Sequence, residues 1–203
     1  MDLQNQKQKD KGKNSSNPII KMKSSEILSL FLESTHLHKR DFAQMIGVTL
    51  SYVYNLIDEA IPFSGRSTTL ERIATVMDIE PEIFKEYKIP QEPIITDEAT
   101  EFLKTVMKEK KIPTYQFLKA FPRKKRVEIV DILRGASPVP SDWQELKSIC
   151  RILGIKTKEI YPYWENRVKQ IFSNSGMNIQ ANSALVTTML NCAKDYINSG
   201  ETI

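Results

Sequence analysis

The chain has 203 residues, with 29 Lys and Arg against 25 Asp and Glu, and a net charge of +4. This length allows one large domain or two small ones, with enough apolar residues for a core in each. No apolar run approaches the roughly 20 residues that span a bilayer, and the polar N-terminus lacks the apolar core of a signal peptide. Glycine is scarce, at seven residues, and no stretch alternates polar and apolar residues for long. We therefore expect an all-α protein of the cytoplasm.

Residues 1–22 carry five lysines among Gln, Asn and Ser, with hardly any apolar residue before Ile19. Such a composition buries too little apolar surface to fold alone, so we expect a disordered arm. A lysine-rich arm can add salt-dependent affinity for a nucleic acid, or it can serve only as a solubilising tail. The composition leaves both interpretations open.

A short helix is predicted to end at Gly47. It begins near His38, and one of its faces carries apolar residues at helical spacing, Phe42, Ala43 and Ile46. Glycine readily adopts the left-handed conformation that closes a helix. Gly47 is therefore expected to form a tight turn.

A second helix is predicted to start two residues after that turn. Thr49 can act as its N-cap, because a threonine hydroxyl accepts a hydrogen bond from a free backbone N–H. The inward face of this helix carries Tyr52, Val53 and Leu56. At 100° per residue, the opposite face carries Ser51, Tyr54, Asn55 and Asp58, with Leu50 on the flank. A polar face of this kind is what a helix needs to read a DNA groove.

With these two helices, residues 24–86 resemble the phage-repressor-like family of helix-turn-helix domains, also called Xre-type or lambda-repressor-like. The motif elements are Phe42-Ala43, Gly47-Val48-Thr49, Ser51, Val53 and Leu56, followed by Leu70, Ile73, Ala74, Met77 and Ile79. The resemblance implies a first helix over 24–35, the pair around Gly47, and closing helices over 69–77 and 81–86. The chain departs from the family at Ile57, where a glutamate is usual, and in a longer loop that contains Pro62.

The resemblance also implies how the domain would bind duplex DNA, with the helix from Thr49 in the major groove and the start of the preceding helix on the backbone. Base edges would be met by Leu50, Ser51 and Asn55, with Tyr54 on the same face. Phosphates would be met by Lys39, Arg40, Thr49 and Arg66. The Asn55 amide donates and accepts together and so suits adenine, whereas Leu50 can make only apolar contact, for instance with a thymine methyl. Taken alone, Lys39 and Arg40 would be ordinary solvated charges.

The apolar pattern of this domain recurs later in the chain. Residues such as Glu26, Phe31 and Phe42 return 75 positions on as Glu101, Val106 and Phe117, and Leu70 and Ile79 return 76 positions on as Leu146 and Ile155. We therefore expect a duplicated domain, with copies at 23–88 and 97–172. The linker at 89–96 contains Pro90 and Pro93, which forbid a continuous helix.

The second copy differs where the first would read DNA. In place of Gly47-Val48-Thr49 it has the sequence PRKKR at 122–126, with one extra residue. If Lys125 replaces Thr49 in phase, the residues that face outward are Val127, Val130, Asp131 and Arg134. Two valines on such a face favour contact with protein over hydrogen bonding to bases.

Charge favours the opposite interpretation of the second copy. Residues 100–134 hold ten Lys or Arg against four Asp or Glu, whereas residues 23–90 hold seven against ten. Local positive charge drives phosphate binding, so this copy can grip a DNA backbone even if it reads no sequence. The candidate backbone contacts are Arg123, Lys124, Lys125 and Arg126, and an ordinary solvated basic face is the alternative.

A last helix is predicted from an N-cap at Asn182 to Asn198. One side of it is expected to carry Leu185, Met189, Leu190, Ala193, Tyr196 and Ile197. We expect this side to pack on the second copy, and a homodimer contact is the alternative. The aromatic cluster at 161–164 is expected to fill the core ahead of a helix that runs through Ile171.

Signs of an enzyme or a metal site are scarce in the chain. Cys150 and Cys192 lie in apolar contexts without histidines at ligand spacing, so we expect buried thiols instead of a metal or redox pair. The chain has no glycine loop to cradle phosphates and no cysteine with a nearby histidine base. We expect no enzyme activity, no cofactor, no metal and no small-molecule sensor domain.

Together these features predict a sequence-specific, double-stranded-DNA-binding protein, a transcriptional regulator on the nucleoid. Its fold would be two tandem five-helix lambda-repressor-like domains and a C-terminal helix in the tail at 173–203. The first copy is acidic and the second has a valine-bearing face. Both properties would also permit a protein-interaction adaptor built on a helix-turn-helix scaffold that has lost DNA reading.

Overall fold

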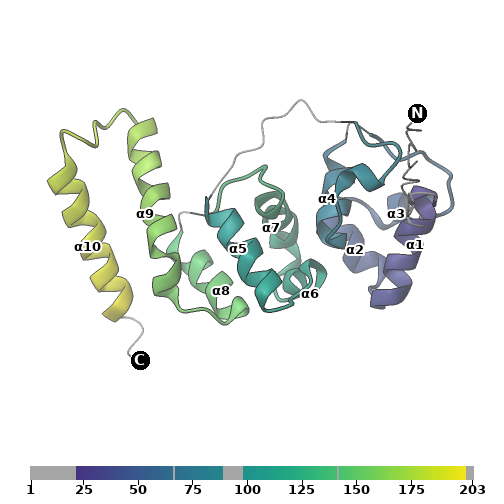
Figure 1. Cartoon of the computed structure of the whole chain (residues 1–203), viewed down its shortest axis with the longest axis horizontal. Helices are drawn as coiled ribbons and strands as arrows, with labels where there is room; N and C mark the ends of the chain where they lie inside the picture. The colour runs from purple at the N-terminus through teal and green to yellow at the C-terminus, as the bar shows by residue number, and fades with distance from the viewer. Residues whose placement is uncertain (1–21, 66, 89–97, 141, 200–203) are drawn as a thin grey trace, which may run out of the picture.

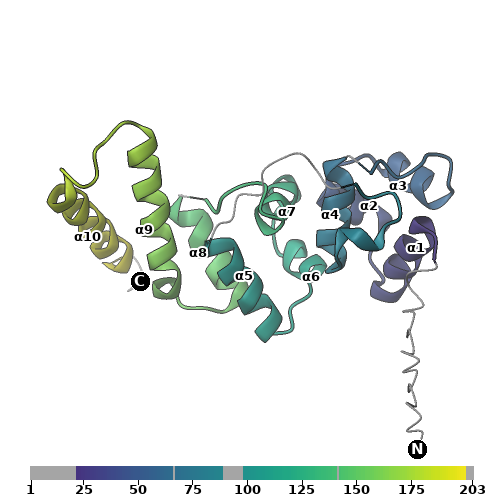
Figure 2. The ribbon, with the colours of Figure 1, turned by 45° about the horizontal axis from the view of Figure 1, so that its top comes forward.

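The computed structural model describes residues 22–65, 67–88, 98–140 and 142–199, and every regular element in these ranges is helical. The expectation of an all-α protein is confirmed. The helices follow one another along an elongated molecule, with α1 and α3 at one end and α10 at the other (Figures 1 and 2). None of the described helices is both long and apolar enough to cross a membrane. Almost all of the lysine-rich arm and the whole linker at 89–96 lie outside the described residues.

The first copy, residues 22–88, contains four α-helices and a short 3-10 helix. These are α1 (Ser24–Thr35), α2 (Lys39–Ile46), α3 (Leu50–Ile57), α4 (Thr68–Met77) and η2 (Pro81–Ile83). The helices end close to their predicted limits, except that η2 stops at Ile83 because the Phe84 backbone returns to an extended conformation. Phe84 is buried instead, where its ring stacks on Phe63 at 5.8 Å between centroids.

The region predicted as the second copy, described over residues 98–174, has an additional 3-10 helix before its third α-helix and an 18-residue helix where the first has the short η2. It contains α5 (Glu98–Glu109), α6 (Thr114–Lys119), η3 (Arg123–Lys125), α7 (Arg126–Leu133), α8 (Trp143–Leu153) and α9 (Thr157–Asn174). The helix predicted to follow the aromatic cluster begins earlier, at Thr157, and includes that cluster. Trp164 is buried there, with its ring 5.8 Å from that of Trp143.

Backbone details recur between the copies at the spacing that the sequence predicts. His36 and Lys111, 75 residues apart, both end a first helix with positive φ, at 50° and 54°. Asp78 and Gly154, 76 residues apart, both end the fourth helix with positive φ, at 55° and 60°. A left-handed backbone is uncommon outside glycine, and three of these four residues are not glycine. Their matching positions therefore indicate the same local geometry in both regions.

The change of spacing from 75 to 76 falls at the turn before the third helix of each copy. Gly47 is left-handed there with φ 75°, whereas Pro122 has φ −55° and leads into the extra turn of η3. After this turn the copies correspond again, since the Asn55 carbonyl accepts from the Ala60 amide at 2.9 Å and the Asp131 carbonyl accepts from the Ala136 amide at 2.8 Å. Asn55 of α3 and Asp131 of α7 therefore occupy equivalent positions.

The two copies pack directly against each other. Helix α7 and the preceding η3 lie against α2, and α7 and α6 lie against α4. The Thr114 amide donates to Asp78 Oδ2 at 2.8 Å, and the Phe31 ring meets the edge of the Tyr115 ring at 5.9 Å. The buried apolar residues of both copies belong to one cluster.

Helix α10 (Ser183–Ser199) lies alongside α9 in both views (Figures 1 and 2). The predicted apolar side was wrong in part, because Val186 and Leu190 are buried while Leu185 and Met189 are 54% and 45% exposed. Residues 185 and 190 are separated by five positions, which is about 140° around a helix, so one face cannot bury both. The prediction for the thiols was also half right, since Cys150 is buried and Cys192 is exposed.

Candidate nucleic-acid interface

Helix α3 presents one exposed face on the surface of the molecule. Its inward side is fully packed, since Val53 and Leu56 are 0% and 1% exposed. The side chains on the opposite side are exposed, and we call these four the reading face: Leu50, Ser51, Tyr54 and Asn55. It combines an amide, two hydroxyls and one apolar group.

The start of α3 is built as the sequence predicts. The Thr49 hydroxyl accepts a hydrogen bond from the Tyr52 amide at 3.2 Å and so caps the helix. Gly47 is left-handed, and the Val48 amide donates to the Ala43 carbonyl at 2.9 Å, which closes α2. This turn fixes the angle at which α3 leaves α2, because both ends of the turn are hydrogen bonded.

Two of the three cations predicted to meet phosphates, Lys39 and Arg40, lie at the start of α2, next to the reading face. The Lys39 ammonium lies 4.6 Å from the centroid of the Tyr54 ring, within range of a cation–π interaction. Arg40 is exposed, while Lys39 is partly covered. Arg66, the third predicted cation, lies outside the described residues.

A hollow in the surface adjoins these residues. It is bordered by α1, by the start of α2 with Lys39 and Arg40, and by Leu50 and Tyr54 of α3. Its remaining wall comes from the second copy, through Arg123 of η3. Side chains from both copies therefore meet beside the reading face.

The equivalent face of the second copy has a different role. Val130 of α7 is fully buried, and Val127 lies so close to the turn of the first copy that a Cβ on Gly47 would come within 3.1 Å of its methyl group. Of the four residues predicted to face outward from α7, Val127, Asp131 and Arg134 contact the first copy, whereas Val130 belongs to the buried core. The face formed by these three residues is therefore a contact within the chain.

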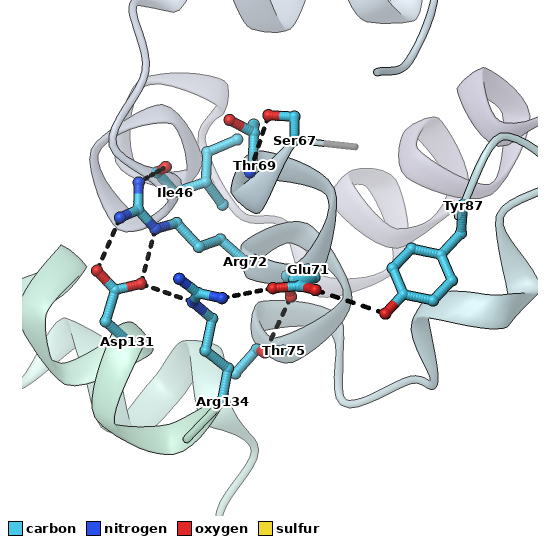
Figure 3. Close-up of polar contacts among 9 residues, drawn as sticks. All are labelled: Ile46, Ser67, Thr69, Glu71, Arg72, Thr75, Tyr87, Asp131 and Arg134. Atoms are coloured by element: carbon cyan, nitrogen blue, oxygen red, sulfur yellow. Dashed lines mark hydrogen bonds and ion pairs between the residues drawn. The ribbon is translucent and has the colours of Figure 1, made fainter. Parts of the chain in front are cut away.

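Charged groups hold that contact together (Figure 3). The Arg72 guanidinium of α4 donates two hydrogen bonds to Asp131 of α7, at 2.8 and 2.7 Å, and Arg134 donates to Asp131 at 2.8 Å. Arg134 also pairs with Glu71, which accepts from the Tyr87 hydroxyl at 3.4 Å. We call these five residues the inter-copy network.

The network shifts the proton affinity of two of its members. Burial favours the neutral acid of Asp131, but hydrogen bonds from Arg72 and Arg134 outweigh it, so the pKa of Asp131 lies below its ordinary value. Burial, together with the nearby charge of Glu71, raises the pKa of the Tyr87 hydroxyl. Asp131 is therefore held as a carboxylate between two guanidinium groups.

The four cations predicted as backbone contacts in the second copy have different environments. Arg126 is 8% exposed and donates to Asp41 of α2 at 3.2 Å and to the Phe121 carbonyl at 3.2 Å. Lys125 pairs with Glu128 and Glu145, and hydrogen bonds to these two carboxylates raise its pKa. Arg123 and Lys124 are exposed. Arg126 is therefore the buried member of the four, whereas Lys125 is paired with carboxylates but keeps 45% of its side chain exposed.

Arg72 and Glu71 were not singled out from the sequence, although they complete the contact between the copies. Their partners lie 59 and 63 positions away along the chain. No spacing rule within a helix can connect residues so far apart. The only sequence feature that pointed to this contact was the predicted outward face of α7, where Asp131 and Arg134 stand beside two valines.

Comparison with known proteins adds no identification. No family model matches the chain, and no match is found among curated proteins or among solved structures.

Proposed function

We propose that this protein binds double-stranded DNA and reads its sequence with α3. The observation that carries the proposal is the contrast between two equivalent helices. The reading face of α3 is exposed and polar, whereas the corresponding face of α7 is occupied by the first copy. Only one of the two helices is free for a groove.

The chemistry of the reading face supports recognition of bases. The Asn55 amide can donate to and accept from an adenine, Ser51 can pair with several bases, and Leu50 can pack on a thymine methyl. Lys39 and Arg40 at the start of α2 would hold the phosphates beside that groove. This arrangement fits a helix-turn-helix domain of the lambda-repressor-like class and a role in transcriptional regulation.

A protein-interaction adaptor is the second candidate, and one observation favours it. Leu50 and Tyr54 are 37% and 44% exposed, and they are neighbours on one face of α3. Exposed apolar groups at this spacing also suit a protein partner. The acidic balance of the first copy would be no obstacle to such a partner.

Binding of the full chain to a labelled duplex of mixed sequence, titrated with salt, separates the two candidates. Phosphate contacts release counterions, so the logarithm of the affinity should fall linearly with the logarithm of the salt concentration, by about 0.9 per contact. Lack of duplex binding at low ionic strength would contradict the proposal and favour the adaptor.

A further inference from the structure

We propose that Arg123 of the second copy completes a phosphate-binding notch for the first copy, so that one DNA backbone is held by both. This inference rests on the proposed DNA binding. The notch is the hollow bordered by Lys39, Arg40, Leu50, Tyr54 and Arg123. It places a guanidinium from a different part of the chain beside the helix that would read the bases.

The charges around the hollow favour an anion. Among the described residues, Lys39, Arg40 and Arg123 contribute three positive groups, and none of them forms an ion pair with a carboxylate. The acids that line the hollow are Glu33 and Asp41, and Asp41 is already paired with Arg126. Three cations therefore face a single uncompensated carboxylate.

Arg123 is also held in position relative to α2. Three residues after it, Arg126 ties the end of η3 to the first copy through Asp41 and to its own copy through the Phe121 carbonyl. Arg126 is 8% exposed, so this connection is largely shielded from water. A cation presented from an anchored turn loses less freedom on binding than one on a free loop.

The distribution of charge explains why a second copy would be useful here. Residues 23–90 have three more acidic than basic groups, which opposes binding to DNA, whereas residues 100–134 have six more basic than acidic groups. Arg123 carries part of that positive charge to the reading helix. A guanidinium suits the task because its planar fork matches phosphate oxygens.

The first test compares Arg123→Ala with Arg151→Ala in the full chain, using the labelled duplex of mixed sequence. Both variants lose one positive charge, but Arg151 is an exposed residue of α8 outside the notch. Arg123→Ala should reduce the slope of log affinity against log salt concentration by about 0.9, because one phosphate contact is lost. Over a tenfold range of salt, a slope of 0.9 corresponds to roughly an eightfold change in affinity, so the variant should bind about eightfold more weakly at 0.1 M salt. Arg151→Ala should keep the wild-type slope.

A second variant, Asp41→Ala, tests the anchoring of the notch. It removes a negative charge next to the proposed DNA site, so net charge alone predicts tighter binding. Loss of the partner of Arg126 should instead free η3 and weaken binding severalfold, with the helical circular dichroism retained at the assay temperature.

The outcomes separate this inference from the proposed function. If the wild-type chain does not bind the duplex, the proposed function fails. If the wild type binds while Arg123→Ala keeps its affinity and salt slope, DNA binding stands and the shared notch is overturned. Tighter binding by Asp41→Ala would likewise overturn the anchoring.

Discussion

Asn55 and Asp131 occupy equivalent positions in the two copies, and their chemistry differs in one group. The Asn55 amide is neutral, exposed and able both to donate and to accept. The Asp131 carboxylate can only accept, and it binds Arg72 across the contact between the copies as well as Arg134 of its own copy. An amide suits a base edge, whereas a carboxylate would repel the phosphates of a duplex. The two residues therefore suit a reading helix and a supporting helix.

Replacing Asn55 should change sequence preference more than overall affinity. We expect Asn55→Ala to cost about 1 to 3 kcal/mol at one base position, because a bidentate contact to one base is lost. Lys39→Ala is the comparison, and it should weaken binding to all sequences alike. Competition among duplexes that differ at single positions measures both effects, and an equal loss across all sequences for Asn55→Ala would contradict the assignment.

Gly47 tests how closely the second copy approaches the turn. Gly47→Ala pays the cost of a left-handed side chain, about 1 to 2 kcal/mol, and also pushes a Cβ against Val127 and Arg72. Gly176→Ala is a matched control, since Gly176 has φ 87° and nothing within 4 Å of an added Cβ. Urea denaturation should show a larger loss of unfolding free energy for Gly47→Ala. Equal losses would mean that α7 does not press on this turn.

Among the helices, α7 uses its outward face, which carries Val127 and members of the inter-copy network, to support the first copy. Arg72, Glu71, Asp131 and Arg134 are between 11% and 20% exposed, so their charges are only weakly screened by water. Such a contact is costly to open, because each ion would lose its partner while partly buried. The network joins α7 to α4, and the pair of Arg126 with Asp41 joins α7 to α2.

The lowered pKa of Asp131 predicts how stability depends on pH. A carboxyl whose pKa is depressed in the folded protein stabilises it above the pKa of the unfolded chain, and this contribution is lost as the pH falls through the folded pKa. The free energy of unfolding should therefore decrease as the pH drops below 3.8, the ordinary pKa of this group. Asp131→Asn should remove this part of the dependence and cost about 2 kcal/mol at neutral pH.

Glu128→Gln provides the control for Asp131→Asn on the same helix. Glu128 pairs with Lys125 at the surface, with 47% of its side chain exposed, so its loss should cost less than about 1 kcal/mol. Urea denaturation at a series of pH values compares the two variants. If the free energy of unfolding of Asp131→Asn depends on acid pH in the same way as that of the wild type, the inter-copy network is not the source of this pH dependence.

The sequence predicted the helix boundaries of the first copy well, because capping residues and turns act on their immediate neighbours in the chain. The hydroxyl of Thr49 and the left-handed Gly47 mark the boundaries of α2 and α3 as expected. The predicted outward face of α7 was correct for Val127 and Asp131, which contact the first copy, and wrong for Val130, which is buried in the core. The residues that pair with this face, Arg72 and Glu71, belong to another helix. Residues so far apart in the sequence produce no periodic pattern from which the pairing could be predicted. In α10, the phase of Leu185 relative to Leu190 was misjudged.

In the whole molecule, the acidic first copy and the basic region of the second copy share one hydrophobic core. The second copy uses its α7 face and Arg126 to hold the first, and it leaves Arg123 exposed beside α3. In this account the duplication supplies one reading helix and one support. The protein would then recognise a single short half-site per chain.

Selection of bound sequences from a random duplex pool, with the wild-type chain and with Asn55→Ala in parallel, shows whether each chain reads a single half-site through α3. The wild type should enrich one short motif with no second motif at a constant spacing, and Asn55→Ala should lose the preference at one position of that motif. Two enriched half-sites at constant spacing would contradict the account, as would a motif that Asn55→Ala leaves unchanged.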